Sequence, residues 1–140
     1  ISAALQRISV DHQQPLSELD AITLGCELAG FDIVALAGAM LAAAAQRLVF
    51  VVDGFICTTA LLLAAKMNPL VTQYALFAHQ SHEKAHQALL AHFSAQPILS
   101  LGMRLGEGSA AILALPLIQS AAAFMAQMAS FESAGVSEER

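Results

Sequence analysis

A carboxylate bracketed by two glycines is the feature of this sequence best suited to chemistry. Glu107 lies between Gly106 and Gly108, follows Arg104 closely, and precedes a long apolar stretch that begins at Ser109. Glycine allows positive φ and close approach of a ligand, and a helix N-terminus attracts anions. The segment therefore suits a catalytic base beside a bound anion. It equally suits a capping loop in which Glu107 only complements the helix dipole, and the motif alone leaves both interpretations open.

A second polar turn, Asp53-Gly54-Phe55, follows a run of β-branched residues. An aspartate at this place can orient a substrate hydroxyl or another loop, and it can equally belong to a plain strand-to-helix turn. The sequence contains neither a G-x-G-x-x-G fingerprint nor a P-loop. It also lacks the G-x-S-x-G elbow of a serine hydrolase.

Histidines gather in the segment from His79 to His86, which also contains Glu83. His82 and His86 are spaced i and i+4, but the H-E-x-x-H order is absent, so they would supply only two metal ligands. We therefore expect no metal site. We interpret the segment as the solvent-facing start of a helix with Ser81 as its N-cap, and we expect that His79 can face a ligand crevice.

An α/β fold is expected to position these segments. Runs rich in β-branched or apolar residues predict parallel strands at 48–53, 74–78 and 97–101. They alternate with expected helices at 15–28 (N-cap Ser17), 31–46, 55–67, 81–93 and 109–134, and with a short helix that starts at Asn68-Pro69. This alternation predicts a parallel β-sheet flanked by Ala-rich helices. Ligands bind at the carboxyl ends of such strands, so the loops at 53–55, 78–83 and 104–109 are expected to meet.

Composition limits the class of protein. The 140 residues are 57% hydrophobic with a formal net charge of −5, and no basic cluster points to nucleic acid. Cys26 and Cys57 are interpreted as small buried hydrophobes in a reducing cytoplasm. His12 and His92, which have no partner nearby in the sequence, are interpreted as surface residues.

Two apolar runs raise the possibility of a membrane protein. Residues 33–52 and 109–129 each approach the length of a spanning helix, roughly 20 residues. Alanine dominates both runs, however, and Pro116 interrupts the second. We expect buried helices without a membrane, and a protein with two spans remains the alternative.

The order of these loops resembles the C-terminal half of the nicotinate-nucleotide–dimethylbenzimidazole phosphoribosyltransferase family. The matching segments are Gly30-Phe31-Asp32, Val52-Asp53-Gly54-Phe55 followed by Thr58, Asn68-Pro69, residues 79–83, residues 104–109, Ala114-Leu115-Pro116 and residues 134–136. The combination of D-G-F with R-L-G-E-G-S is specific. The sequence departs from the family at Ala78, Ala85 and Ala110, where serine or glycine is expected.

The resemblance implies a Rossmann-like α/β fold that is incomplete relative to the full family fold. Nothing in the sequence matches the substrate loop and lysine of the family's N-terminal half. Residues 1–140 are therefore expected to form a single partial domain, with the long helix of 109–140 in a small helical subdomain. The missing N-terminal half and a second copy of the enzyme, in a homodimer, are the partners that the resemblance implies.

The resemblance also implies a reaction: nicotinate mononucleotide and 5,6-dimethylbenzimidazole give α-ribazole 5′-phosphate and nicotinate, a step of cobalamin lower-ligand assembly. The pyridinium is already a cationic leaving group, so neither a cofactor nor a metal is expected. Glu107 is implied as the catalytic base. Substrate binding is implied for Ser81, Arg104, Leu105, Gly106 and Gly108, whereas Asp53 is expected to be structural. We expect the chain alone to be inactive, and the alternative is a non-catalytic fragment that only folds and dimerises.

Overall fold

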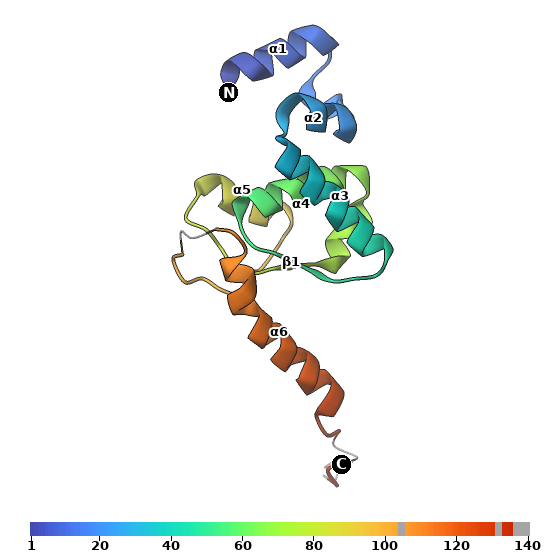
Figure 1. Cartoon of the computed structure of the whole chain (residues 1–140), viewed down its shortest axis with the longest axis vertical. Helices are drawn as coiled ribbons and strands as arrows, with labels where there is room; N and C mark the ends of the chain where they lie inside the picture. Colours follow the sequence, from blue (N-terminus) through green and yellow to red (C-terminus); the bar gives the residue numbers. More distant parts are fainter. Residues whose placement is uncertain (104–105, 131–132, 136–140) are drawn as a thin grey trace, which may run out of the picture.

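The structure, a computed structural model, describes residues 1–103, 106–130 and 133–135. Helices within these ranges are α1 (Ser2–His12), α2 (Ala21–Leu28), α3 (Phe31–Ala45), α4 (Phe55–Met67), α5 (Lys84–His92) and α6 (Ser109–Gln127). The 3₁₀ helices are η1 (Leu16–Glu18) and η2 (Pro69–Tyr74), and the strands are β1 (Phe50–Val52) and β2 (Ala75–Phe77). Figure 1 shows an elongated molecule with α1 and α6 at opposite ends.

The two strands pair in parallel, with Phe50 opposite Ala75 and Val52 opposite Phe77. This confirms the expected α/β class, with a sheet much smaller than a complete fold would have. The third expected strand, 97–101, is reduced to one parallel bridge between His79 and Leu99. Two local features limit the length of this strand. Pro97 has no N–H to donate to a ladder, and the chain turns at Gly102, where φ is 65°.

Small side chains build the core between the sheet and its helices. The buried residues of the main cluster are Ala37, Met40, Val52, Ala60, Leu61, Ala64 and Val71. Three of these seven are alanines, and Ala60 and Ala64 lie one turn apart on α4. Without bulky side chains on this face, the backbones of neighbouring helices can approach closely. The alanine-rich composition therefore allows tight packing of these helices.

The first turns of α6 pack against the sheet, but the rest of this helix does not. Ala110 and Ala114 are buried in a second cluster with Ala78. Beyond them α6 runs away from the body (Figure 1), and it exposes large apolar side chains. These include Leu113, Leu115, Leu117, Phe124 and Met125. The expectation that this run is a buried helix is therefore wrong for the chain by itself.

The first apolar run folds as expected, whereas the second ends earlier than expected. Residues 33–52 divide into α3 and β1, as expected, and α3 is too short to span a membrane. Within the described residues, α6 is the helix that has the length and apolar composition of a membrane span. It ends at Gln127 rather than near Ala134. Downstream, the Ser130 hydroxyl accepts from the Ser133 N–H and replaces a helical bond.

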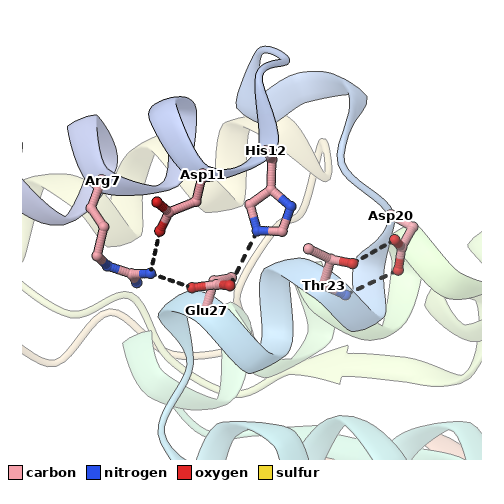
Figure 2. Close-up of polar contacts among 6 residues, drawn as sticks. All are labelled: Arg7, Asp11, His12, Asp20, Thr23 and Glu27. Atoms are coloured by element: carbon pink, nitrogen blue, oxygen red, sulfur yellow. Dashed lines mark hydrogen bonds and ion pairs between the residues drawn. The ribbon is translucent and has the colours of Figure 1, made fainter.

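The N-terminal helices contain a feature that the sequence pattern did not predict. Ile8 of α1 is fully buried, and two polar contacts join α1 to Glu27 of α2. Figure 2 shows Arg7 bonded to both Asp11 (3.3 Å) and Glu27 (2.8 Å), while His12 reaches Glu27 at 3.1 Å. His12 is therefore a partnered residue rather than an isolated surface histidine. Its partner is 15 positions away, beyond the reach of local sequence patterns.

The expected helix 15–28 is divided into η1 and α2, and its N-cap is Asp20 rather than Ser17. The Asp20 carboxylate accepts from the backbone N–H groups of Ile22 and Thr23, at 2.9 and 3.0 Å, and from the Thr23 hydroxyl. These contacts explain why α2 begins after Asp20, because the carboxylate satisfies two first-turn amides at once. The thiols also depart from expectation: Cys26 is exposed and Cys57 is partly buried, and both are free.

Candidate functional site

The three polar loops meet in one pocket of about 550 Å³ at the carboxyl ends of the strands. Its lining includes Asp53, Gly54 and Phe55 from the first loop, and His79, Ser81, His82 and Glu83 from the second. Gly106, Glu107 and Gly108 complete it from the third. The structure thus brings together Ser81, Gly106, Glu107 and Gly108 as the strand-end rule predicts. Arg104 and Leu105, also expected at this site, lie outside the described residues.

Glu107 is held in a tight turn at the start of α6. Its φ is 62° and that of Gly108 is 82°, so two successive residues adopt the left-handed conformation. The Ser109 hydroxyl donates to the Gly106 carbonyl at 2.6 Å and closes the turn. The left-handed region costs a glutamate about 1–2 kcal/mol relative to its ordinary conformation. A strained residue that lines a pocket is typical of functional sites.

Helices α4 and α6 both begin at this pocket. Gly54 precedes α4, and no side chain caps that helix. The first three residues of α4, Phe55, Ile56 and Cys57, line the pocket. Helix N-termini of this kind attract negatively charged groups. The positive end of α4 therefore makes one wall suitable for an anion.

Asp53 links β1 to the start of α6. Its carboxylate Oδ1 accepts from the backbone N–H of Ala111 at 2.8 Å, across 58 positions of sequence. Asp53 is 8% exposed, so this bond is shielded from water. The carboxylate thus fixes the helix that follows Glu107 against the strand. This bond supports the structural interpretation of Asp53.

Replacing Asp53 by alanine is expected to destabilise the fold by about 1–3 kcal/mol, because the Ala111 N–H would lose its acceptor in a partly buried setting. Asp53→Asn retains an acceptor oxygen and should recover most of that loss. Chemical denaturation of both variants beside the unsubstituted protein measures the difference. An alanine variant as stable as the unsubstituted protein would contradict the capping role.

His86 forms a buried hydrogen-bond network behind the pocket wall. It is 1% exposed, and its Nε2 lies 3.1 Å from the Thr58 hydroxyl. Its Nδ1 accepts from the Ser81 backbone N–H at 3.1 Å and lies 3.0 Å from the Ser81 hydroxyl. Ser81 is therefore not the N-cap of α5, which begins at Lys84 with Glu83 as its cap. The N-cap expected at Ser81 is therefore wrong, because Ser81 bonds to the inward-facing His86. Residues 82–85 are exposed, as expected for a solvent-facing helix start.

Burial lowers the pKa of His86 below its ordinary value of 6.5, and the neighbouring His79 lowers it further, while Glu83 acts in the opposite direction. The folded protein therefore resists protonation of His86. As the pH falls below 6.5, the unfolded chain takes up this proton first, so stability is lost until the lower folded pKa is passed. Above pH 6.5 this histidine adds no pH dependence.

Melting temperatures between about pH 7.5 and pH 5 should therefore fall more steeply in the unsubstituted protein than in His86→Asn. Asparagine can still accept from Ser81 but does not titrate, so it provides the matched control. Parallel melting curves of the two proteins would contradict the assignment of this pH dependence to His86.

His79 is the other buried histidine of the site. It is 4% exposed, and its Nε2 has no hydrogen-bond partner in the structure as described. It lines the pocket, which agrees with its expected position at the crevice. The described residues include no group of three or more His, Cys, Asp or Glu side chains able to hold a metal. Of the histidines in this segment, His86 is buried and hydrogen-bonded, His79 is buried, and His82 is exposed.

Comparisons with known proteins place this pocket in a family. A family model described as phosphoribosyltransferase matches residues 1–136. The chain belongs to this phosphoribosyltransferase family. It is 53% identical over 98% of its length to a nicotinate-nucleotide–dimethylbenzimidazole phosphoribosyltransferase of Cupriavidus taiwanensis, and 58% identical over 81% to one of Shewanella oneidensis. The family resemblance read from the loops is thereby confirmed.

The structural comparison agrees. The crystal structure of nicotinate-nucleotide–dimethylbenzimidazole phosphoribosyltransferase from Thermus thermophilus is similar over 87% of this chain, with a TM-score of 0.82 and 37% sequence identity. The chain covers 37% of that structure, 38% of the Cupriavidus taiwanensis relative and 32% of the Shewanella oneidensis one. It thus spans roughly a third of the length of these family members.

Sequence reasoning assigned no role to His86 beyond a doubtful metal ligand, although a signal for its burial was present. His86 and Leu90 lie one helical turn apart, and both are buried. A polar residue on the apolar face of a helix requires a hydrogen-bond partner. Thr58, 28 residues away, supplies that partner, and only the fold brings the two together.

Proposed function

We propose that this chain provides the catalytic base of an enzyme that transfers the phosphoribosyl group of nicotinate mononucleotide to 5,6-dimethylbenzimidazole. The products are α-ribazole 5′-phosphate and nicotinate. The observation that carries this proposal is the placement of Glu107, in a left-handed turn, in the pocket where the loops of a phosphoribosyltransferase family member meet. The pocket volume of about 550 Å³ falls within the usual range for small ligands.

The chemistry requires one proton acceptor. One benzimidazole nitrogen attacks the anomeric carbon of the ribose as the bond to the pyridinium nitrogen breaks, and the electrons of that bond neutralise the pyridinium. The other benzimidazole nitrogen then carries a proton that must leave. A glutamate carboxylate is ionised at neutral pH and can take it. Attack from the face opposite nicotinate inverts the anomeric carbon from β to α.

The remaining groups of the pocket suit the nucleotide. In this proposal Ser81, Arg104, Leu105, Gly106 and Gly108 contact the substrate, with glycine allowing its close approach. The N-terminus of α4 provides a positive dipole end for the phosphate. No divalent ion is needed to neutralise a leaving group, because the departing nicotinate ring was cationic before the bond broke.

The chain acts in this proposal as the C-terminal part of a longer cytoplasmic enzyme that forms a homodimer. It is one partial domain, and α6 belongs to a small helical subdomain that the rest of the enzyme completes. Two observations support this: the chain covers 38% of its Cupriavidus taiwanensis relative, and α6 exposes apolar side chains along most of its length. The same partial coverage favours the second candidate, a non-catalytic fragment.

The experiment that tests the proposal uses the complete enzyme containing this chain, with both substrates. Mass spectrometry should detect α-ribazole 5′-phosphate, and proton NMR of the anomeric position should show the α configuration. A chelator should leave the rate unchanged. Absence of the product, or a rate that is lost on chelation and restored by a divalent ion, would overturn the proposed reaction as described.

A further inference from the structure

The hydrogen bonds around His86 determine which of its ring nitrogens carries the proton. The Ser81 backbone N–H can only donate, so Nδ1, at 3.1 Å, must be an acceptor without a proton. A neutral imidazole then carries its hydrogen on Nε2. That nitrogen lies 3.1 Å from the Thr58 hydroxyl oxygen, which accepts from it. The Thr58 hydroxyl in turn donates a hydrogen bond to the Gly54 carbonyl at 2.8 Å.

This chain of bonds connects two walls of the pocket. Gly54 and Thr58 belong to the turn after β1 and to α4, and Ser81 lies in the loop after β2. His86, on α5, is in contact with both and is 1% exposed. Each polar group in this hydrogen-bond network has a partner, as buried polar groups require. The histidine therefore fixes the distance between the two loops rather than filling space alone.

The Ser81 hydroxyl is the one group in this network with a choice of partner. Its oxygen lies 3.0 Å from Nδ1, but Nδ1 has a single lone pair, which the Ser81 N–H already approaches. If the hydroxyl turns toward a ligand, Nδ1 keeps its backbone donor. The hydroxyl oxygen also receives a weak bond from the Glu83 N–H at 3.4 Å. Ser81 can therefore donate its proton into the pocket without leaving a buried group unsatisfied.

We propose that His86 is a positioning residue for the proposed transferase: its Nε2-protonated tautomer, anchored by Thr58, holds Ser81 at the pocket wall, where the Ser81 hydroxyl donates to an oxygen of the nucleotide. The identity of the ligand rests on the proposed function, whereas the tautomer and the hold on Ser81 rest on the hydrogen bonds alone. His86 itself does not touch the reacting atoms.

Two substitutions separate the two ring nitrogens. Asparagine at position 86 places an acceptor near the position of Nδ1, and glutamine places its amide near that of Nε2. In the complete enzyme, His86→Gln should raise KM for nicotinate mononucleotide about 10-fold, the scale of one hydrogen bond to a charged oxygen, with kcat changed much less. His86→Asn should recover most of that loss. Ser81→Ala should match His86→Gln.

A double-mutant cycle completes the test. Because both residues act through one contact, Ser81→Ala combined with His86→Gln should be no worse than either alone. Additive effects, an unchanged KM in His86→Gln, or an asparagine variant as impaired as the glutamine variant would overturn the proposal. Melting curves exclude global unfolding as the cause, since a purely structural role would not separate KM from kcat.

Nitrogen-15 NMR of the unsubstituted complete enzyme provides a second test that needs no activity. The proposal predicts a His86 side chain protonated at Nε2 and unprotonated at Nδ1 at neutral pH. The opposite tautomer would overturn it even if all variants unfold. If the enzyme forms no α-ribazole 5′-phosphate, the proposed function fails, and the tautomer still decides whether His86 holds Ser81.

Discussion

Replacing Glu107 by glutamine in the complete enzyme is expected to reduce turnover by about 10²–10⁴-fold, the usual contribution of a general base. Glutamine preserves the shape of the side chain and can still form a hydrogen bond with the benzimidazole, but it cannot accept its proton. Both residues meet the same cost in the left-handed turn, where φ is 62°, so the loop should keep its conformation. KM for nicotinate mononucleotide should remain near its original value.

The competing interpretation is that Glu107 only complements the dipole of α6. In that case the substitution would cost less than about 1 kcal/mol of stability and leave turnover unchanged. Steady-state kinetics beside a melting curve distinguishes the two. Glu83→Gln is a matched control, since Glu83 lines the same pocket and has no assigned catalytic role. Near-normal turnover of Glu107→Gln with a lowered melting temperature would refute the catalytic assignment.

The isolated 140-residue chain is expected to show no turnover under conditions in which the complete enzyme is active. It covers 38% of its Cupriavidus taiwanensis relative, and the sequence does not match the substrate loop and lysine implied for the family's other half. A base without the groups that align the two substrates loses the large advantage of proximity, which can reach about 7–11 kcal/mol.

A product assay at equal concentrations of the isolated chain and the complete enzyme measures this difference. Adding the separately produced N-terminal part should restore some activity if it can pack against the exposed apolar side of α6. The Glu107→Gln form of the same mixture is the control for contaminating enzyme. Formation of α-ribazole 5′-phosphate by the isolated chain above that control would contradict the expectation.

The order of the first strand, its polar turn and the following helix was predictable from this sequence because it depends on local patterns. The β-branched run before Asp53 and the helix from Phe55 to Met67 both appear as expected, since a polar turn with glycine separates two apolar segments of different period. In a parallel sheet the carboxyl ends of strands share an edge, so the meeting of the three loops in one pocket follows from topology.

The contacts that refine the site were not predictable, because they join residues far apart in the chain. The pairs His86–Thr58 and Asp53–Ala111 are 28 and 58 positions apart. Local reasoning assigned Ser81 to a helix cap, since serine commonly has that role. In the structure Ser81 instead bonds to the buried ring of His86, five positions later in the sequence. The docking of α1 on α2 through Arg7 and Glu27 belongs to the same class of long-range contact.

The strength of a strand also depends on more than its own residues. The apolar segment 97–101 has the composition of a strand, yet it forms a single bridge to His79. Pro97 at its start and the positive φ of Gly102 at its end limit the length that can pair. A hydrophobic pattern predicts which residues are buried, but it does not show where the backbone can no longer pair with a neighbouring strand.

A crystal structure of the complete enzyme with 5,6-dimethylbenzimidazole bound tests the central claim most directly. The account predicts the benzimidazole in the pocket lined by Glu107, Phe55 and Ser81, with one ring nitrogen about 2.6–3.2 Å from a Glu107 carboxylate oxygen. A benzimidazole bound outside this pocket, or a Glu107 carboxylate directed away from both ring nitrogens, would contradict it.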